Sequence, residues 1–202
     1  MPASSDPTTA PGPSIWLVRH GETEWARTGR HTGLTDIPLT AIGRQEALDL
    51  APRLAGHPFA AVISSPLSRA LDTARLAGFG DVVQIDPDLV EWDYGDDEGR
   101  TTLEIRAERP DWTIWSQGPA GGELLDAVAE RVDRVIERAR AIEGITLCFA
   151  HGHLLRILGA RWIGLAPTGG ESLALDTATI SILGWDREAP AIRRWNDGVD
   201  LD

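Results

Sequence analysis

An arginine and a histidine stand side by side in Arg19-His20-Gly21, directly after the short apolar run at residues 15–18. The guanidinium offers a fork of donors that fits an oxyanion, and the imidazole can act as a base, a metal ligand or a nucleophile. For an isolated triplet, the alternative is an arginine that caps strand carbonyls beside a surface histidine. We expect the chain to carry chemistry where this first strand ends.

A second arginine, Arg69, follows Ser64-Ser65-Pro66 and falls in the first turn of a predicted helix. The free N–H groups and partial positive charge of a helix N-terminus favour a bound anion, so an arginine there suits a phosphate. The alternative is an ion pair with Asp72, three residues further along the helix surface.

Two further stretches carry titratable side chains. Five carboxylates lie within residues 91–98, a run that is typical of a solvated acidic loop or a cation site. The second stretch is His151-Gly152-His153, which follows the apolar run 145–150. These two histidines could hold a metal ion together with the acidic loop, although no third ligand is evident.

Four stretches, at residues 19–40, 64–74, 89–99 and 149–156, resemble in the same order the signatures of the histidine phosphatase superfamily, the phosphoglycerate-mutase-like proteins. The resemblance implies that His20 is the nucleophile that accepts the phosphoryl group and that Glu91 is the general acid. It also implies that Arg19, Arg69 and His151 neutralise the phosphoryl oxygens. No metal and no cofactor would then be required.

Within the superfamily, residues 31–36 and 91–95 look most like the acid phosphatase and sugar-bisphosphatase branch. On this resemblance we assign substrate binding to Thr32, Gly33, Tyr94, Gly152 and His153. The alternatives are an ordinary turn at Thr32 and Gly33 and a packing role for Tyr94. The expected substrate is a small phosphorylated metabolite.

The match departs from the family in two places. Ala26 stands where family members commonly carry an asparagine that contacts phosphate, so we expect weaker phosphate binding. All 19 basic residues are arginine, and Thr102 occupies the position of a lysine found in cofactor-dependent mutases. We therefore expect a phosphomonoesterase that works through a phosphohistidine. The alternatives are a sugar-bisphosphate-specific phosphatase, a phosphoglycerate mutase, a metal-dependent hydrolase and a non-catalytic phosphate-binding module.

The elements around these residues predict an α/β fold. Apolar runs at 15–18, 59–64, 82–85 and 145–150 read as buried strands, and two later strands follow at 178–185 and 191–195. Helices are expected at 40–54, 67–78, 101–109, 123–142 and 153–164, with the Glu and Arg residues of 123–142 on a solvated face. Repeated strand-helix units predict a single three-layer domain, with a mainly parallel sheet covered by helices on both faces. Ligands bind such sheets beyond the carboxyl ends of the strands.

Composition limits the partners. A net charge of −12 disfavours binding to nucleic acids or anionic membranes, and the single cysteine, Cys148, excludes an intramolecular disulfide. Residues 1–13 read as a disordered leader without the features of a signal peptide, residues 14–195 as the domain, and 196–202 as an acidic tail. We expect a cytoplasmic protein and leave open whether it forms a homodimer.

Overall fold

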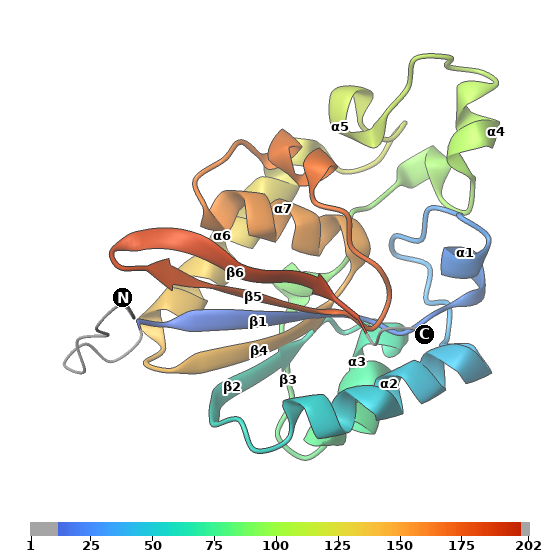
Figure 1. The fold of residues 1–202 in the computed structure, drawn as a ribbon. Helices are drawn as coiled ribbons and strands as arrows, with labels where there is room; N and C mark the ends of the chain where they lie inside the picture. Colours follow the sequence, from blue (N-terminus) through green and yellow to red (C-terminus); the bar gives the residue numbers. More distant parts are fainter. Residues whose placement is uncertain (1–11, 199–202) are drawn as a thin grey trace, which may run out of the picture.

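The computed structural model describes residues 12–198, which form one α/β domain (Figure 1). Its first half contains β1 (Ser14–Arg19), α1 (Glu24–Arg27), α2 (Ala41–Leu54), β2 (Phe59–Ser64), α3 (Ser68–Ala74), β3 (Gln84–Ile85) and α4 (Thr102–Arg106). The second half contains α5 (Ile114–Gln117), α6 (Leu125–Ala141), β4 (Ile145–Ala150), α7 (Gly152–Trp162), β5 (Ile180–Asp186) and β6 (Ala189–Asp197). Short 3-10 helices lie at Pro87–Leu89, Gly95–Asp97 and Pro167–Ser172.

The six strands form one sheet in the order β3-β2-β4-β1-β5-β6. The pairs β3-β2, β2-β4 and β4-β1 are parallel, whereas β5 runs antiparallel to both β1 and β6. In the central pair, Arg19 lies opposite Ala150, and the His20 N–H donates to the Ala150 carbonyl at 3.0 Å. His20 and His151 therefore leave the sheet side by side at its carboxyl edge, as the strand pattern predicts.

Helices cover both faces of the sheet, which confirms the predicted three-layer architecture. Figure 1 shows α2 and α3 on one face and α6 and α7 on the other. Successive side chains of the central strands point to opposite faces of the sheet and belong to two hydrophobic cores. Leu17 and Cys148 pack toward α6 and α7, while Val18 and Phe149 pack toward α2 and α3. Both faces of β1 are therefore buried, which explains its continuous apolar run.

Helix α2 begins as predicted, because the Thr40 hydroxyl accepts the Gly43 N–H at 3.0 Å. The apolar residues at positions 42, 47, 48, 50, 51 and 54 predict a buried stripe on this helix. The prediction is wrong at Ile42, which is 59% exposed, and at Leu48, which is 45% exposed. Gly43 faces inward instead. A Cβ added there would lie 2.1 Å from the Glu22 carbonyl oxygen, so only glycine lets α2 approach the segment that follows the catalytic strand.

Helix α3 and strand β3 differ from the sequence prediction. The helix expected at 67–78 ends its α-helical part at Ala74 and continues as a π-helical turn over Arg75–Phe79, in which Gly78 adopts a φ of 95°. The strand expected at 82–85 is reduced to the two residues of β3. Glycine tolerates the left-handed conformation that ends this helix, so Gly78 acts as its terminator.

The predicted leader falls almost wholly outside the described residues, as do residues 199–202 of the predicted tail. Over residues 12–198, no helix has the length and apolar character needed to cross a membrane.

Candidate active site

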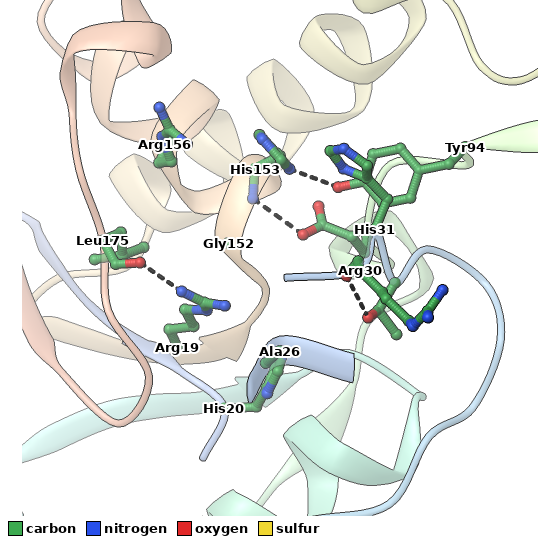
Figure 2. A pocket seen from close by; sticks show the side chains of 12 residues that line it. Arg19, His20, Ala26, Arg30, His31, Tyr94, Gly152, His153, Arg156 and Leu175 are labelled. Carbon is green, nitrogen blue, oxygen red and sulfur yellow. Dashed lines mark hydrogen bonds between the residues drawn. The ribbon is translucent and has the colours of Figure 1, made fainter. Parts of the chain in front are cut away.

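A cavity of about 110 Å³ opens at the carboxyl edge of the sheet, where β1 and β4 end (Figure 2). Its walls come from the ends of these strands, α1, the loop that follows α1, and the start of α7. The lining residues are Arg19, His20, Ala26, Arg30, His31, Thr32, Glu91, Tyr94, Gly152, His153, Arg156 and Leu175. Basic side chains predominate, so the cavity suits a small anion although the whole chain is acidic.

His20 is buried, with 5% of its surface exposed, and its ring is held by a single hydrogen bond. Nδ1 lies 2.8 Å from the Gly21 carbonyl oxygen, which can only accept, so Nδ1 carries the proton. Burial lowers the pKa of His20 well below its usual value, and the charges of Arg69 and Arg19 lower it further. His20 is therefore a neutral imidazole with a free lone pair on Nε2.

Arg19 keeps an unused donor in the cavity wall. Its Nη1 donates to the Leu175 carbonyl at 2.6 Å, whereas the buried Nε has no hydrogen-bond partner. Burial lowers the pKa of Arg19, and the Glu91 carboxylate acts in the opposite direction. A guanidinium stays protonated under such shifts, so Arg19 presents a positive charge with a donor that an incoming oxyanion can satisfy.

Arg69 and His151 lie behind the cavity lining and contact each other. Arg69 Nε donates to His151 Nδ1 at 3.2 Å, which leaves the His151 proton on Nε2, 2.7 Å from the Ser65 hydroxyl. Burial, followed by the charge of Arg69, lowers the pKa of His151 well below its usual value. The ring centroids of His151 and His20 are 5.2 Å apart, so this neutral histidine lies next to His20.

The alternative reading of Arg69 as a partner of Asp72 is wrong, since Asp72 pairs with Arg75. Arg69 is fully buried and donates to the carbonyls of Thr32, Gly33 and Thr35 in the loop after α1, at 2.8–3.2 Å. The first turn of α3 thereby fixes the loop that forms one wall of the cavity.

Glu91 lines the cavity and is 4% exposed. Its carboxylate accepts three backbone N–H groups, from Trp92 at 2.9 Å, His153 at 3.0 Å and Leu154 at 2.9 Å. Two of these donors belong to the first turn of α7, so the positive end of that helix holds the carboxylate in place. The other four carboxylates of the acidic run do not line the cavity.

Tyr94, His153 and His31 form an aromatic wall on one side of the cavity (Figure 2). The Tyr94 hydroxyl and His153 Nδ1 are 2.5 Å apart, and the rings of His31 and Tyr94 are 5.0 Å apart. Burial raises the pKa of Tyr94 well above its usual value and lowers the pKa of His153 well below its own, so this pair is uncharged. The wall can therefore contact a substrate body without adding charge.

The structure brings most of the predicted substrate-binding residues to the cavity, namely Thr32, Tyr94, Gly152 and His153, but Gly33 is not among the lining residues. The Gly33 N–H donates to both carboxylate oxygens of Glu98, at 2.9 and 3.0 Å. A Cβ at Gly33 would lie 2.5 Å from the Trp92 carbonyl oxygen, so glycine permits the close contact between the two cavity loops.

Sequence reasoning assigned no role to two arginines that line the cavity, Arg30 and Arg156. Arg30 Nη1 donates to the Gly99 carbonyl at 2.6 Å, and Arg156 packs over the Trp115 ring, 4.8 Å from its centroid. The available signal for Arg30 was its place beside His31, inside the first motif at residues 19–40. Arg156 lies on α7 in the turn after His151 and His153, so helical spacing could have indicated it.

Across residues 12–198, no three or more His, Cys, Asp or Glu side chains are arranged to hold a metal ion. His151 and His153 point their rings into different surroundings, since His151 contacts Ser65 while His153 contacts Tyr94. Cys148 is fully buried in β4, and burial raises the pKa of its thiol, which is typical of an inert core cysteine.

The protein has an α/β fold, and its cavity holds a buried neutral histidine among arginines at the carboxyl edge of the mainly parallel sheet. Such a site is suited to chemistry on a phosphoryl group. The family model of the histidine phosphatase superfamily (branch 1) matches residues 15–198. An acid phosphatase of Mycobacterium tuberculosis (strain ATCC 25618 / H37Rv) is 42% identical over 181 residues, covering 85% of this chain and 86% of the relative. The chain therefore belongs to the histidine phosphatase superfamily and is a hydrolytic phosphatase, as its four motifs predict.

Two further relatives lie in the same family. Sedoheptulose 1,7-bisphosphatase of Saccharomyces cerevisiae (strain ATCC 204508 / S288c) is 36% identical over 192 residues, covering 76% of this chain and 68% of the relative. A solved structure of a mycobacterial glucosyl-3-phosphoglycerate phosphatase in complex with VO3 superposes with a TM-score of 0.83 at 28% identity, covering 93% of this chain and 100% of that one. These relatives confirm the fold and the small-metabolite phosphatase class.

Proposed function

We propose that this protein hydrolyses phosphomonoesters of small metabolites through a phosphohistidine formed on His20, without a metal ion. The observation that carries the proposal is the state of His20: its Nδ1 proton is held by the Gly21 carbonyl, and burial beside Arg69 and Arg19 keeps the ring neutral. A neutral imidazole with a fixed tautomer is a nucleophile ready for use at neutral pH.

In the first step, His20 Nε2 attacks phosphorus, a nitrogen–phosphorus bond forms, and the bond from phosphorus to the leaving oxygen breaks. Arg19, whose Nε is unpartnered, binds an equatorial oxygen, and Arg69, whose Nε is held by His151, adds positive charge from behind. Glu91 supplies the proton that the leaving oxygen needs. The product is an alcohol and a phosphorylated His20.

In the second step, water attacks the phosphorylated His20 while Glu91, which has given up its proton, takes one from the water. The nitrogen–phosphorus bond breaks, inorganic phosphate leaves, and His20 regains its free lone pair. The same carboxylate thus serves as acid and then as base, so Glu91 must remain in one fixed position through both steps.

A sugar bisphosphate is the substrate class that the cavity favours beyond the general reaction. Arg30 and Arg156 line the cavity in addition to Arg19, so more positive charge is present than one phosphoryl group uses. Thr32, Tyr94, Gly152 and His153 would contact the sugar. The yeast relative carries the name of a sedoheptulose bisphosphatase, which agrees with this choice.

Mutase activity is disfavoured. The chain has no lysine, and Thr102, which stands at the mutase lysine position, is 3.3 Å from His31 Nε2 through its hydroxyl. We further propose that the protein works in the cytoplasm and binds neither nucleic acid nor anionic membranes. A net charge of −12 supports the second statement.

Phosphate release in EDTA tests the proposal, with p-nitrophenyl phosphate, phosphoglycerates, and hexose and heptose bisphosphates as substrates. We expect release by the wild type, loss of release in His20→Ala, and unchanged release in His57→Ala, which removes an exposed histidine on the far loop before β2. Wild-type protein that releases no phosphate from any compound would instead support a binding module, and restoration only by added metal would support the metal-dependent alternative.

A further inference from the structure

Arg131 is a charged residue in the buried face of α6. Only 6% of its surface is exposed, and it lies among Val128, Val132 and Val135, which belong to the core. A buried charge is costly unless it is paired and hydrogen-bonded. The sequence places Arg131 with the solvated residues of this helix, so its burial calls for a physical reason.

All five N–H donors of this guanidinium are used. Nε and Nη2 donate to the two carboxylate oxygens of Glu123, each at 2.9 Å. Nη1 donates to the carbonyls of Asp88 at 2.9 Å and Val90 at 2.6 Å, and Nη2 also donates to the Glu91 carbonyl at 3.2 Å. Three of the five hydrogen bonds therefore hold the main chain that delivers Glu91.

Glu123 holds the same segment from its other end. The Glu123 N–H donates to the Asp93 carbonyl at 2.9 Å, and its carbonyl accepts the Trp92 indole N–H at 2.7 Å. Together, Arg131 and Glu123 fix the backbone on both sides of Glu91. Neither residue lines the cavity, so neither contacts a bound substrate, and the hydrogen bonds above connect both to the site through the segment that carries Glu91.

We propose that Arg131 is a positioning residue for the proton donor: it fixes the main chain at residues 88–91 so that the Glu91 carboxyl reaches the leaving oxygen. Stability alone does not explain it, because a buried ion pair seldom stabilises a fold more than apolar side chains of similar size. The inference rests on the proposed role of Glu91.

When proton donation is impaired, the loss of activity depends on the leaving group of the substrate. A general loss of structure lowers the activity on all substrates alike, so the two causes can be distinguished. An alkoxide leaves a phosphate ester only with a proton, whereas p-nitrophenolate leaves without one. A misplaced Glu91 therefore slows attack on an alkyl phosphate and spares p-nitrophenyl phosphate. We compare kcat/KM for the two substrates, because this ratio reports the first chemical step and not the later hydrolysis of phosphohistidine.

Four variants make the test. Glu91→Gln removes the proton donor and gives the change in kcat/KM that its complete loss causes. Arg131→Met removes the guanidinium, and a double variant, Arg131→Met with Glu123→Leu, removes both charges so that the half-buried Glu123 carboxylate is not left unpaired. The matched control is Arg134→Met on the same helix, because Arg134 is exposed and bonds to the Asp88 side chain instead of the main chain at Glu91.

We expect Glu91→Gln to lower kcat/KM for the alkyl phosphate by about 10²- to 10⁴-fold relative to p-nitrophenyl phosphate, the usual range for a general acid. Arg131→Met and the double variant should show the same selectivity at about 10- to 100-fold, and Arg134→Met should show none. Equal losses on both substrates in the double variant would overturn the positioning role. Glu91→Gln without selectivity would instead overturn the proton-donor role in the proposed function, and with it this inference.

Discussion

Three histidines, the buried His20 and His151 and the half-buried His153, make the stability of this protein sensitive to mild acid. Burial is the largest cause that lowers the pKa of each below the usual 6.5, and neighbouring arginines add to the effect. Below pH 6.5 the unfolded chain therefore binds protons that the folded chain does not. Stability falls as the pH drops through 6.5, and it continues to fall until the folded-state pKa of each histidine is reached.

The size of the effect follows from linkage. Between pH 7.5 and 5.5, a histidine with an unfolded pKa of about 6.5 that stays neutral when folded loses about 1.4 kcal/mol of stability. Three such residues together lose roughly 4 kcal/mol, a large share of the ~5–15 kcal/mol that a domain has. Carboxylates add little in this window, because their unfolded pKa values lie near ~4.

Urea unfolding of the wild type and of His153→Asn at pH 7.5 and 5.5 measures this loss. We expect the variant to lose about 1.4 kcal/mol less than the wild type over the window, because it has one titrating imidazole fewer. Tyr94→Phe is the matched control: it removes the same 2.5 Å hydrogen bond but no imidazole, and it should keep the full pH dependence. Wild-type stability that is equal at both pH values, or higher at pH 5.5, would refute the reasoning.

Three further predictions concern the cavity and its supports. Ala26→Asn should lower the inhibition constant for inorganic phosphate about three- to tenfold, because an amide donor to a charged ligand is added; an unchanged constant would contradict this. Gly43→Ala should lower the free energy of unfolding by about 1–3 kcal/mol in urea, since its Cβ would lie 2.1 Å from the Glu22 carbonyl oxygen. Asp97→Asn should lower the free energy of unfolding, measured by thermal unfolding, by roughly 2 kcal/mol, because Asp97 is buried and pairs with the partly exposed Arg109. The same change should raise KM by loosening the loop that carries Tyr94. Stability equal to the wild type would show that the pair contributes nothing.

The parts of the fold that local patterns dictate were predictable from the sequence. β1 and β4 are continuous apolar runs because both of their faces are covered, β2 is apolar although it is buried only at Val62 and Ser64, and α2 starts at the expected cap. The predicted stripe failed at Ile42 and Leu48, since α2 approaches its neighbour through Gly43. Such a close contact between backbones depends on tertiary packing, which no helical period reveals.

The candidate site was predictable in its residues and less so in its contacts. The motifs and the parallel sheet brought Arg19, His20 and Glu91 to one cavity, but they did not show that Arg69 and His151 lie behind it and bond to each other. The sequence prediction placed Arg131 on the solvated face of its helix, because charged side chains are usually exposed. Its position three residues after Val128 and four before Val135 places it on the apolar face, and that spacing was the available signal.

The central claim is that turnover proceeds through a phosphorylated His20. Rapid quenching into alkali during hydrolysis of a ³²P-labelled ester, followed by peptide mapping, tests it most directly. The account predicts alkali-stable, acid-labile label that approaches one phosphoryl group per chain on the peptide containing His20, and no label in His20→Ala. Steady phosphate release by the wild type without label, or equal label in the His20→Ala variant, would contradict it.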